Sequence, residues 1–125
     1  MNNDIAFTIQ RVDAAYVNSL VDLVNACRKN DVAIDEVGYY QHGWRVTFKG
    51  YEGDAICHNG SYGSPCYMGI YTPEVERNDW NDRGDWETIN FPWDRDDVSV
   101  HSADTLAVMI AALNRGDNWE DYEGC

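Results

Sequence analysis

The first apolar residues of the chain alternate with polar or small ones. Ile5, Phe7 and Ile9 are separated by Ala6 and Thr8. Because successive side chains of a strand point to opposite faces, this period of two predicts a half-buried strand over about residues 5–10.

From about residue 14 to residue 29 the apolar positions recur at spacings of three and four. This period is typical of an amphipathic helix that packs one stripe against a core. The residues of the stripe are Val17, Leu20, Val21, Val24 and Cys27. We expect Asp13 to cap the N-terminus of this helix, since Asp is a favoured N-cap residue.

Strand-like segments with polar turns between them fill the middle of the chain. The first covers about residues 34–40, and the turn 41–43 leads to a second over residues 44–48, where apolar and polar residues alternate. Two more, at 55–58 and 66–71, flank a loop rich in Gly, Ser and Asn. These patterns predict two antiparallel hairpins.

The last third of the chain predicts two short strands and a helix. The strands lie at about 87–91 and 98–100. Leu and Met residues at helical spacing predict a helix over about 103–114, with Ser102 as N-cap and Gly116 as its stop. The expected fold is therefore α+β, with an antiparallel sheet of about five strands packed by two helices on one face.

Charge is distributed unevenly along the 125 residues. The chain has 22 acidic and 9 basic residues, a net charge of −13. Residues 1–73 carry 8 acids and 5 bases, whereas residues 74–125 carry 14 acids and 4 bases. We expect a single domain, 1–125, with an acidic second half, 74–125. Such a field repels nucleic acid and anionic membranes and attracts basic surfaces.

No secretory or transit signal precedes the first predicted element, and the longest apolar window, 107–113, is too short to span a bilayer. We expect a soluble intracellular protein whose four cysteines remain thiols. Neither direct nucleic-acid binding nor membrane binding is expected.

The stretch NDWNDRGDWETINFPWDRDD, residues 78–97, combines three tryptophans with many carboxylates. Trp anchors dominate many protein interfaces, and carboxylates around them steer a basic partner. Trp119 has a similar setting in the C-terminal tail. Tryptophans beside polar loops also fold back onto a core, and we expect this of Trp86 and Trp93 first.

Metal sites have weak support in the sequence. Cys57, His58 and Cys66 flank one predicted loop, but zinc usually takes close ligand pairs such as C-x-x-C, which the chain lacks. A fourth ligand would have to come from His42, His101 or Cys27 through the fold. We expect neither a metal nor a cofactor.

Calcium is the second metal considered. Asp79, Asn81 and Gly84 match three positions of an EF-hand loop. Arg83 occupies position 5, where that loop needs an oxygen ligand, and Asn90 occupies position 12, where it needs a bidentate Glu. A looser calcium site with Asp82, Asp85 or Glu87 remains an alternative to a solvated acidic loop.

Catalytic signatures are missing from the sequence. Ser61 and Ser64 lie in a Gly-rich loop without a G-x-S-x-G elbow. We therefore expect no enzymatic activity and assign no catalytic residue. The rival enzyme hypothesis is a hydrolase that uses His58 with Cys57 or Asp54.

Small size, strong acidity, scattered aromatic residues and no catalytic motif together resemble phage-encoded inhibitors of bacterial defence, the anti-CRISPR proteins and the DNA-mimicking anti-restriction proteins. The resemblance is one of composition and of the acidic second half. It implies a non-enzymatic inhibitor that binds a basic nucleic-acid-binding surface of a CRISPR effector nuclease by acidic and aromatic mimicry. The residues expected to contact this partner are Asp79, Trp80, Asp82, Asp85, Trp86, Glu87, Asp94, Asp96, Asp97, Trp119, Glu120, Asp121 and Glu123.

The alternative is a small-molecule or nucleotide-binding module. Its pocket would be lined by aromatic residues of the predicted strands beside the Gly-rich loop, namely Tyr39, Tyr40, Trp44, Tyr51, Tyr62, Tyr67 and Tyr71. The sequence leaves both a monomer and a homodimer open, because a sheet with free edges can pair with a second copy.

Overall fold

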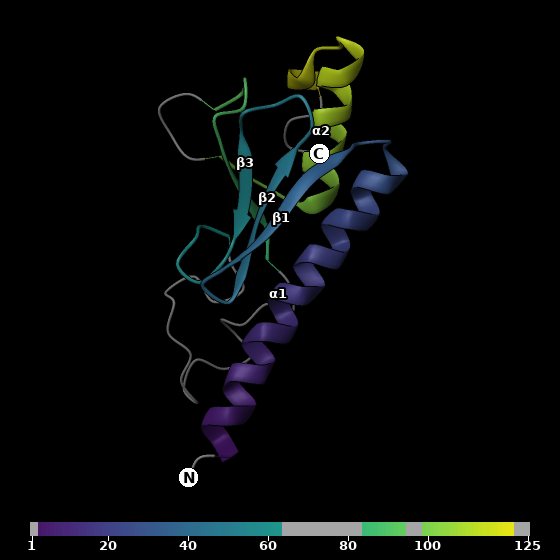
Figure 1. Cartoon of the computed structure of the whole chain (residues 1–125). Helices are drawn as coiled ribbons and strands as arrows, with labels where there is room; N and C mark the ends of the chain where they lie inside the picture. The colour runs from purple at the N-terminus through teal and green to yellow at the C-terminus, as the bar shows by residue number, and fades with distance from the viewer. Residues whose placement is uncertain (1–2, 64–83, 95–98, 122–125) are drawn as a thin grey trace.

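A computed structural model describes residues 3–63, 84–94 and 99–121, with the backbone alone for residues 3–14 and 121. Two helices and five strands form an α+β fold, as predicted (Figure 1). In chain order the elements are α1 (Asn3–Lys29), β1 (Ile34–Tyr40), β2 (Gly43–Phe48), β3 (Asp54–Cys57), β4 (Trp86–Ile89), β5 (Ser99–His101), α2 (Ala103–Arg115) and the short 3-10 helix η1 (Trp119–Asp121).

Helix α1 is longer than the sequence pattern predicts. The helix expected over residues 14–29 is confirmed, but the strand expected over 5–10 is wrong, because these residues belong to the same helix. Asp13 therefore lies inside α1 and is not its N-cap. Ile5 and Ile9 are also four residues apart, so the same positions satisfy a helical period, and continuation of an existing helix needs no new nucleus.

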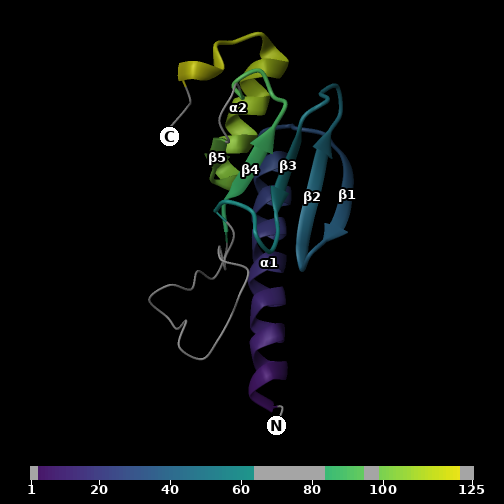
Figure 2. The ribbon, with the colours of Figure 1, turned by 90° about the vertical axis from the view of Figure 1, so that its left-hand side faces the viewer.

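The five strands form one antiparallel sheet in the order β1-β2-β3-β4-β5 (Figure 2). The strands predicted at 34–40, 44–48, 55–58, 87–91 and 98–100 are confirmed to within about two residues. The one predicted at 66–71 lies outside the described residues. In the described part of the chain, β3 pairs with β4, with Asp54 opposite Ile89.

The turn between β1 and β2 has two residues, Gln41 and His42, with φ of 45° and 67°. Two consecutive residues with positive φ define the tight hairpin turn whose twist matches that of the strands. Gly43 follows at once, and a Cβ there would lie 2.0 Å from the carbonyl oxygen of Cys57. Only glycine therefore allows β2 and β3 to approach at this point.

Two rows of side chains on one face of the sheet form the sheet's part of the core. Val46, Ala55 and Thr88 are in register across β2, β3 and β4, and all are buried. In the neighbouring row Trp86 lies opposite His101, and both are buried. Burial of the apolar members of these rows, Val46, Ala55 and Trp86, stabilises the fold through the hydrophobic effect.

Helix α2 has the predicted caps. The Ser102 hydroxyl accepts a hydrogen bond from the Thr105 N–H at 3.2 Å, and Gly116 ends the helix with φ of 78°. Helix α1 contacts α2 and β2, and the Trp44 indole N–H donates to the Tyr16 carbonyl at 3.0 Å. Helix α2 in turn contacts α1 and β5. Packing of both helices on one face of the sheet stays a prediction.

Candidate acidic binding site

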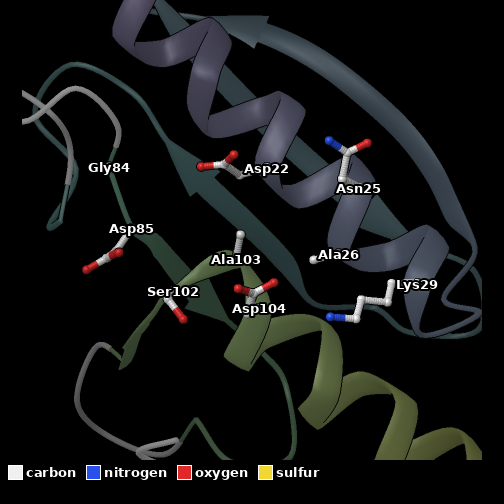
Figure 3. A pocket seen from close by; sticks show the side chains of 9 residues that line it. All are labelled: Asp22, Asn25, Ala26, Lys29, Gly84, Asp85, Ser102, Ala103 and Asp104. Carbon is white, nitrogen blue, oxygen red and sulfur yellow. The ribbon is translucent and has the colours of Figure 1, made fainter.

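An open cavity of about 390 Å³ lies where α1, the start of β4 and the start of α2 meet (Figure 3). We call it the acidic cavity. Its lining residues are Asp22, Asn25, Ala26, Lys29, Gly84, Asp85, Ser102, Ala103 and Asp104. Three segments far apart in the sequence therefore form one site.

Helix geometry places the α1 residues on a single wall. Asp22, Asn25, Ala26 and Lys29 follow one another at spacings of three, one and three, so they share a face of α1. In Figure 3 Asp85 lies at one end of the cavity and Lys29 at the other.

The opposite wall begins with the cap of α2. Ser102, Ala103 and Asp104 are the N-cap and the first two residues of the helix. A carboxylate in a first turn is favoured by the partial positive charge of the helix N-terminus. The position of Asp104 is therefore explained by helix stability as well as by any binding role.

Charge in the acidic cavity is unbalanced. Its lining holds three acids, Asp22, Asp85 and Asp104, and one base, Lys29. Within the described part of the chain, neither Asp85 nor Asp104 forms a hydrogen bond or an ion pair through its carboxylate. Both side chains are exposed. The cavity thus presents uncompensated negative charge that a cation from outside can reach.

A hydrogen-bond chain holds the start of β4 against α1. The Gly84 N–H donates to the Ser19 hydroxyl at 2.7 Å, and this hydroxyl donates to the Ala15 carbonyl at 3.1 Å. Ser19 is fully buried. This link fixes Asp85, the next residue, at the mouth of the cavity.

Of the residues predicted to contact a partner, Asp85 is the one that the structure brings to this cavity. Trp86 is 0 % exposed, so its predicted role as a surface anchor is wrong. The expectation that Trp86 and Trp93 fold back onto the core is confirmed, since Trp93 is 5 % exposed.

Two predicted contact residues, Glu87 and Asp94, bind backbone groups inside the fold instead. The Glu87 carboxylate accepts from the Tyr62 N–H at 2.8 Å, and the side chain is 8 % exposed. Asp94 accepts from the Phe91 N–H at 3.1 Å and from the Thr88 hydroxyl at 3.0 Å. These carboxylates fix a loop and a turn, and their contact with a partner stays a prediction.

The C-terminal patch is partly described. Trp119 is half-buried, with its ring centroid 5.8 Å from that of Trp93, and Glu120 is exposed. The remaining predicted contacts, Asp79, Trp80, Asp82, Asp96, Asp97, Glu123 and the side chain of Asp121, lie outside the described residues.

Neither metal prediction gains support from the described ranges. Among residues with described side chains, no group of three or more His, Cys, Asp or Glu is arranged to hold a metal ion. Cys66 and most of the EF-hand-like stretch lie outside those ranges, so both alternatives stay untested there.

The candidate nucleophiles of the enzyme hypothesis are engaged in the fold. The pKa of the Cys57 thiol is raised to about 12, mainly by burial; a hydrogen bond with Ser19 lowers it and the charge of Asp85 raises it. The thiolate, which is the nucleophilic form, is therefore scarce at neutral pH. The Ser61 hydroxyl donates to the His58 carbonyl at 2.9 Å and accepts from its N–H at 3.0 Å, closing a turn.

The tyrosines of the small-molecule hypothesis are spread over several places. Tyr39 packs edge-on against Trp44, and Tyr40 against His58. The Tyr51 hydroxyl donates to the Asn114 side chain at 2.7 Å, near the end of α2. None of them lines the acidic cavity. Tyr67 and Tyr71 lie outside the described residues.

Sequence reasoning missed most of the acidic cavity. Asp22, Asn25 and Lys29 were part of an ordinary polar helix face, and Asp104 followed a predicted cap. The spacing of polar residues on α1 could have indicated the cavity, but every solvated helix face has such a spacing.

No protein-family model, curated protein or solved structure is significantly similar to this chain. Within the described residues, no helix has the length and apolar character needed to cross a membrane.

Proposed function

We propose that this protein is a non-enzymatic inhibitor that binds a basic, nucleic-acid-binding surface of a bacterial defence nuclease, such as a CRISPR effector, in the bacterial cytoplasm. The observation that carries the proposal is that three acids from separate segments, Asp22, Asp85 and Asp104, line one open cavity. The nuclease class comes from the compositional resemblance described above.

Basic nucleic-acid channels present the chemistry that such a cavity accepts. Their Lys and Arg side chains bind phosphates, and carboxylates offer the same oxygen acceptors and negative charge. An Arg guanidinium donates through a planar fork that fits carboxylates well. We therefore assign the acidic cavity as the place where one basic side chain of the partner docks.

The charge of the whole chain supports this assignment at longer range. A net charge of −13 attracts a basic partner before contact and raises the association rate. Such attraction is screened by salt, because the Debye length falls to about 8 Å at physiological ionic strength. Binding should therefore weaken as salt increases.

A matched pair of triple variants tests the proposal. The cavity variant is Asp22→Asn, Asp85→Asn and Asp104→Asn. The control variant changes three exposed acids elsewhere, Asp31→Asn, Glu52→Gln and Asp117→Asn, and so alters the net charge equally. Tagged proteins are used to capture partners from bacterial lysates, and purified CRISPR nucleases are tested directly.

We expect a basic nuclease that elutes with salt and is displaced by its own nucleic acid. The cavity variant should bind it about tenfold more weakly than the control variant does. If both variants weakened binding of the nuclease equally, the cavity would act only through its contribution to the net charge. Binding of no basic nucleic-acid enzyme by the unmodified chain would overturn the proposal.

A further inference from the structure

Strand β1 forms one edge of the sheet and is exposed along nearly its whole length. It pairs with β2 on one side, and no described element pairs with its other side (Figure 2). Residues 35–40 are all exposed. An edge of this kind presents unpaired backbone donors and acceptors, which can pair with another extended chain.

The hairpin register identifies the unpaired backbone groups. A two-residue turn is closed by a hydrogen-bonded pair, here Tyr40 and Gly43. Hydrogen-bonded and non-hydrogen-bonded pairs alternate along an antiparallel ladder. Tyr39 opposite Trp44 and Val37 opposite Val46 are therefore non-hydrogen-bonded pairs. The N–H and C=O groups of Val37 and Tyr39 point away from β2, toward the free edge.

The two halves of β1 differ in how well they resist pairing. The register shifts between Ile34 and Glu36, so Asp35 is an extra, bulged residue followed by a second acid. Bulges and charges are the usual means by which proteins protect an edge strand. Residues 37–40 carry no charge and no proline, and Val37, Tyr39 and Tyr40 are 43 %, 66 % and 53 % exposed.

Aromatic side chains flank the unprotected half on both faces of the sheet. The Tyr39 ring lies 5.8 Å from the Trp44 ring, and the Tyr40 ring lies 4.9 Å from the His58 ring. Since Tyr39 and Tyr40 are adjacent in a strand, their side chains point to opposite faces. A strand added at this edge would gain one aromatic neighbour on each face.

We propose that an extended, basic segment of a protein partner pairs with Val37–Tyr40 as a sixth strand of the sheet. Charge decides the kind of segment. Strand β1 itself carries two adjacent exposed acids, Asp35 and Glu36, and no base. A second copy of this chain would bring another −13 of charge to the edge.

This inference rests on the proposed function for the basic character of the partner, and it adds how that partner is held. Main-chain hydrogen bonds supply affinity in strand addition, and side chains at alternate positions supply specificity. Lys or Arg side chains next to Asp35 and Glu36 would fix the direction of the added strand.

The probe for the test is a blocked synthetic peptide of about eight residues that alternates Lys and Val, with a matched Glu and Val peptide as control. Amide hydrogen exchange is measured on the whole chain with and without each peptide. We expect the Val37 and Tyr39 amides to exchange rapidly in the free protein and to become at least about tenfold protected by the Lys peptide alone.

A pair of variants at one position separates backbone pairing from aromatic contact. Tyr39→Pro removes an outward N–H that the β1–β2 ladder does not use, and proline is tolerated at such edge positions. Tyr39→Ala removes the ring but keeps the N–H. Binding of the Lys peptide should fall at least about tenfold in the proline variant and less in the alanine variant.

Several results would overturn the inference. They are no binding of the Lys peptide at millimolar concentration, protection confined to other strands, or equal binding of both peptides. Protection of Val37 and Tyr39 that rises with protein concentration alone would assign the edge to a second copy. A nuclease that binds the Tyr39→Pro chain normally but not the cavity variant would remove this inference and leave the proposed function standing.

Discussion

The sequence neighbours of the tryptophan in β4 suggest an exposed side chain, and those of the tyrosines in β1 suggest buried ones. The structure shows the opposite in both strands. Trp86 stands between two acids, Asp85 and Glu87, yet it is 0 % exposed. Tyr39 stands beside Gly38 and Tyr40 in an uncharged stretch, yet it is 66 % exposed. Adjacent charge therefore does not predict whether an aromatic side chain of this protein reaches solvent.

Position in the sheet explains the difference. β4 lies between β3 and β5, so a side chain on its core row has neighbours on both sides, whereas β1 has one neighbouring strand. Asp85 precedes the strand and is exposed, whereas Trp86 is the first residue of β4 and lies on its buried row. A carboxylate next to a tryptophan in sequence is thus compatible with full burial of the ring.

The largest effect is expected from Trp86→Ala. Truncation of a fully buried tryptophan leaves a cavity and should lower the free energy of unfolding by about 3–5 kcal/mol. Urea unfolding followed by circular dichroism measures it. Among the described atoms the indole N–H of Trp86 has no hydrogen-bond partner, so Trp86→Phe should cost far less. A loss below about 1 kcal/mol for the alanine variant would place Trp86 at the surface.

The second-largest effect is a loss of stability at high pH that is caused by the buried thiols. Burial raises the pKa of Cys57 from 9.0 to about 12 and that of Cys27 from 9.0 to about 11. The stabilising contribution of each protonated thiol is fully present below the unfolded pKa, near 9.0, and is lost as pH rises through the folded value. Stability should therefore fall between pH 9 and 12 by roughly a few kcal/mol.

A Cys27→Ala, Cys57→Ala double variant is the control for this effect, because lysines and tyrosines titrate in the same range. Denaturant midpoints are compared at several pH values. The double variant should lose less stability on going from neutral pH to high pH than the unmodified chain. Identical pH profiles would contradict the burial of the two thiols.

The third effect tests the hydrogen bond that holds Trp93 inward. Its indole N–H donates to the Thr88 hydroxyl at 2.9 Å. Thr88→Val keeps the shape but removes both the acceptor for Trp93 and the donor to Asp94, which should cost about 1–3 kcal/mol because a buried donor loses its partner. Thr88→Ser keeps the hydroxyl and serves as the control. Equal stability of the valine variant and the unmodified chain would show that Trp93 is held by packing alone.

The smallest effect on stability is expected at the edge. Tyr39→Ala should change the free energy of unfolding by no more than about 0.5 kcal/mol, as for most exposed positions. The measurement is the same urea titration. A loss of stability comparable to that of Trp86→Ala would mean that Tyr39 is buried. The two strands would then not differ in the exposure of their aromatic side chains.

Much of the fold was predictable from local signals. A strand-like segment before the turn at Gln41 and His42 predicted β1, alternation after it predicted β2, and Ser102 with Gly116 marked both ends of α2. These features depend on backbone geometry within a few residues. The error at residues 5–10 arose because Ile5 and Ile9 fit both periods, and the choice between them is made by the rest of α1.

The acidic cavity was not predictable in the same way. Asp85 belonged to the acidic stretch, but Asp22 and Asp104 are about sixty and twenty residues away from it in the chain. The buried hydroxyl of Ser19 links α1 to the segment before β4 by binding Gly84, and α1 also contacts α2, which carries Asp104. Such a contact depends on tertiary packing, which no local period encodes.

The close approach of β2 and β3 at Gly43 limits which residues homologues of this protein can carry at that position. Surface charges change easily between relatives, but a Cβ at position 43 would meet the Cys57 carbonyl, and one at position 53 would lie 2.8 Å from the Ile89 carbonyl. Substitution at either site forces neighbouring strands apart. A distant homologue should therefore share these two glycines, at their spacing of ten, long after the carboxylates that surround the cavity have diverged.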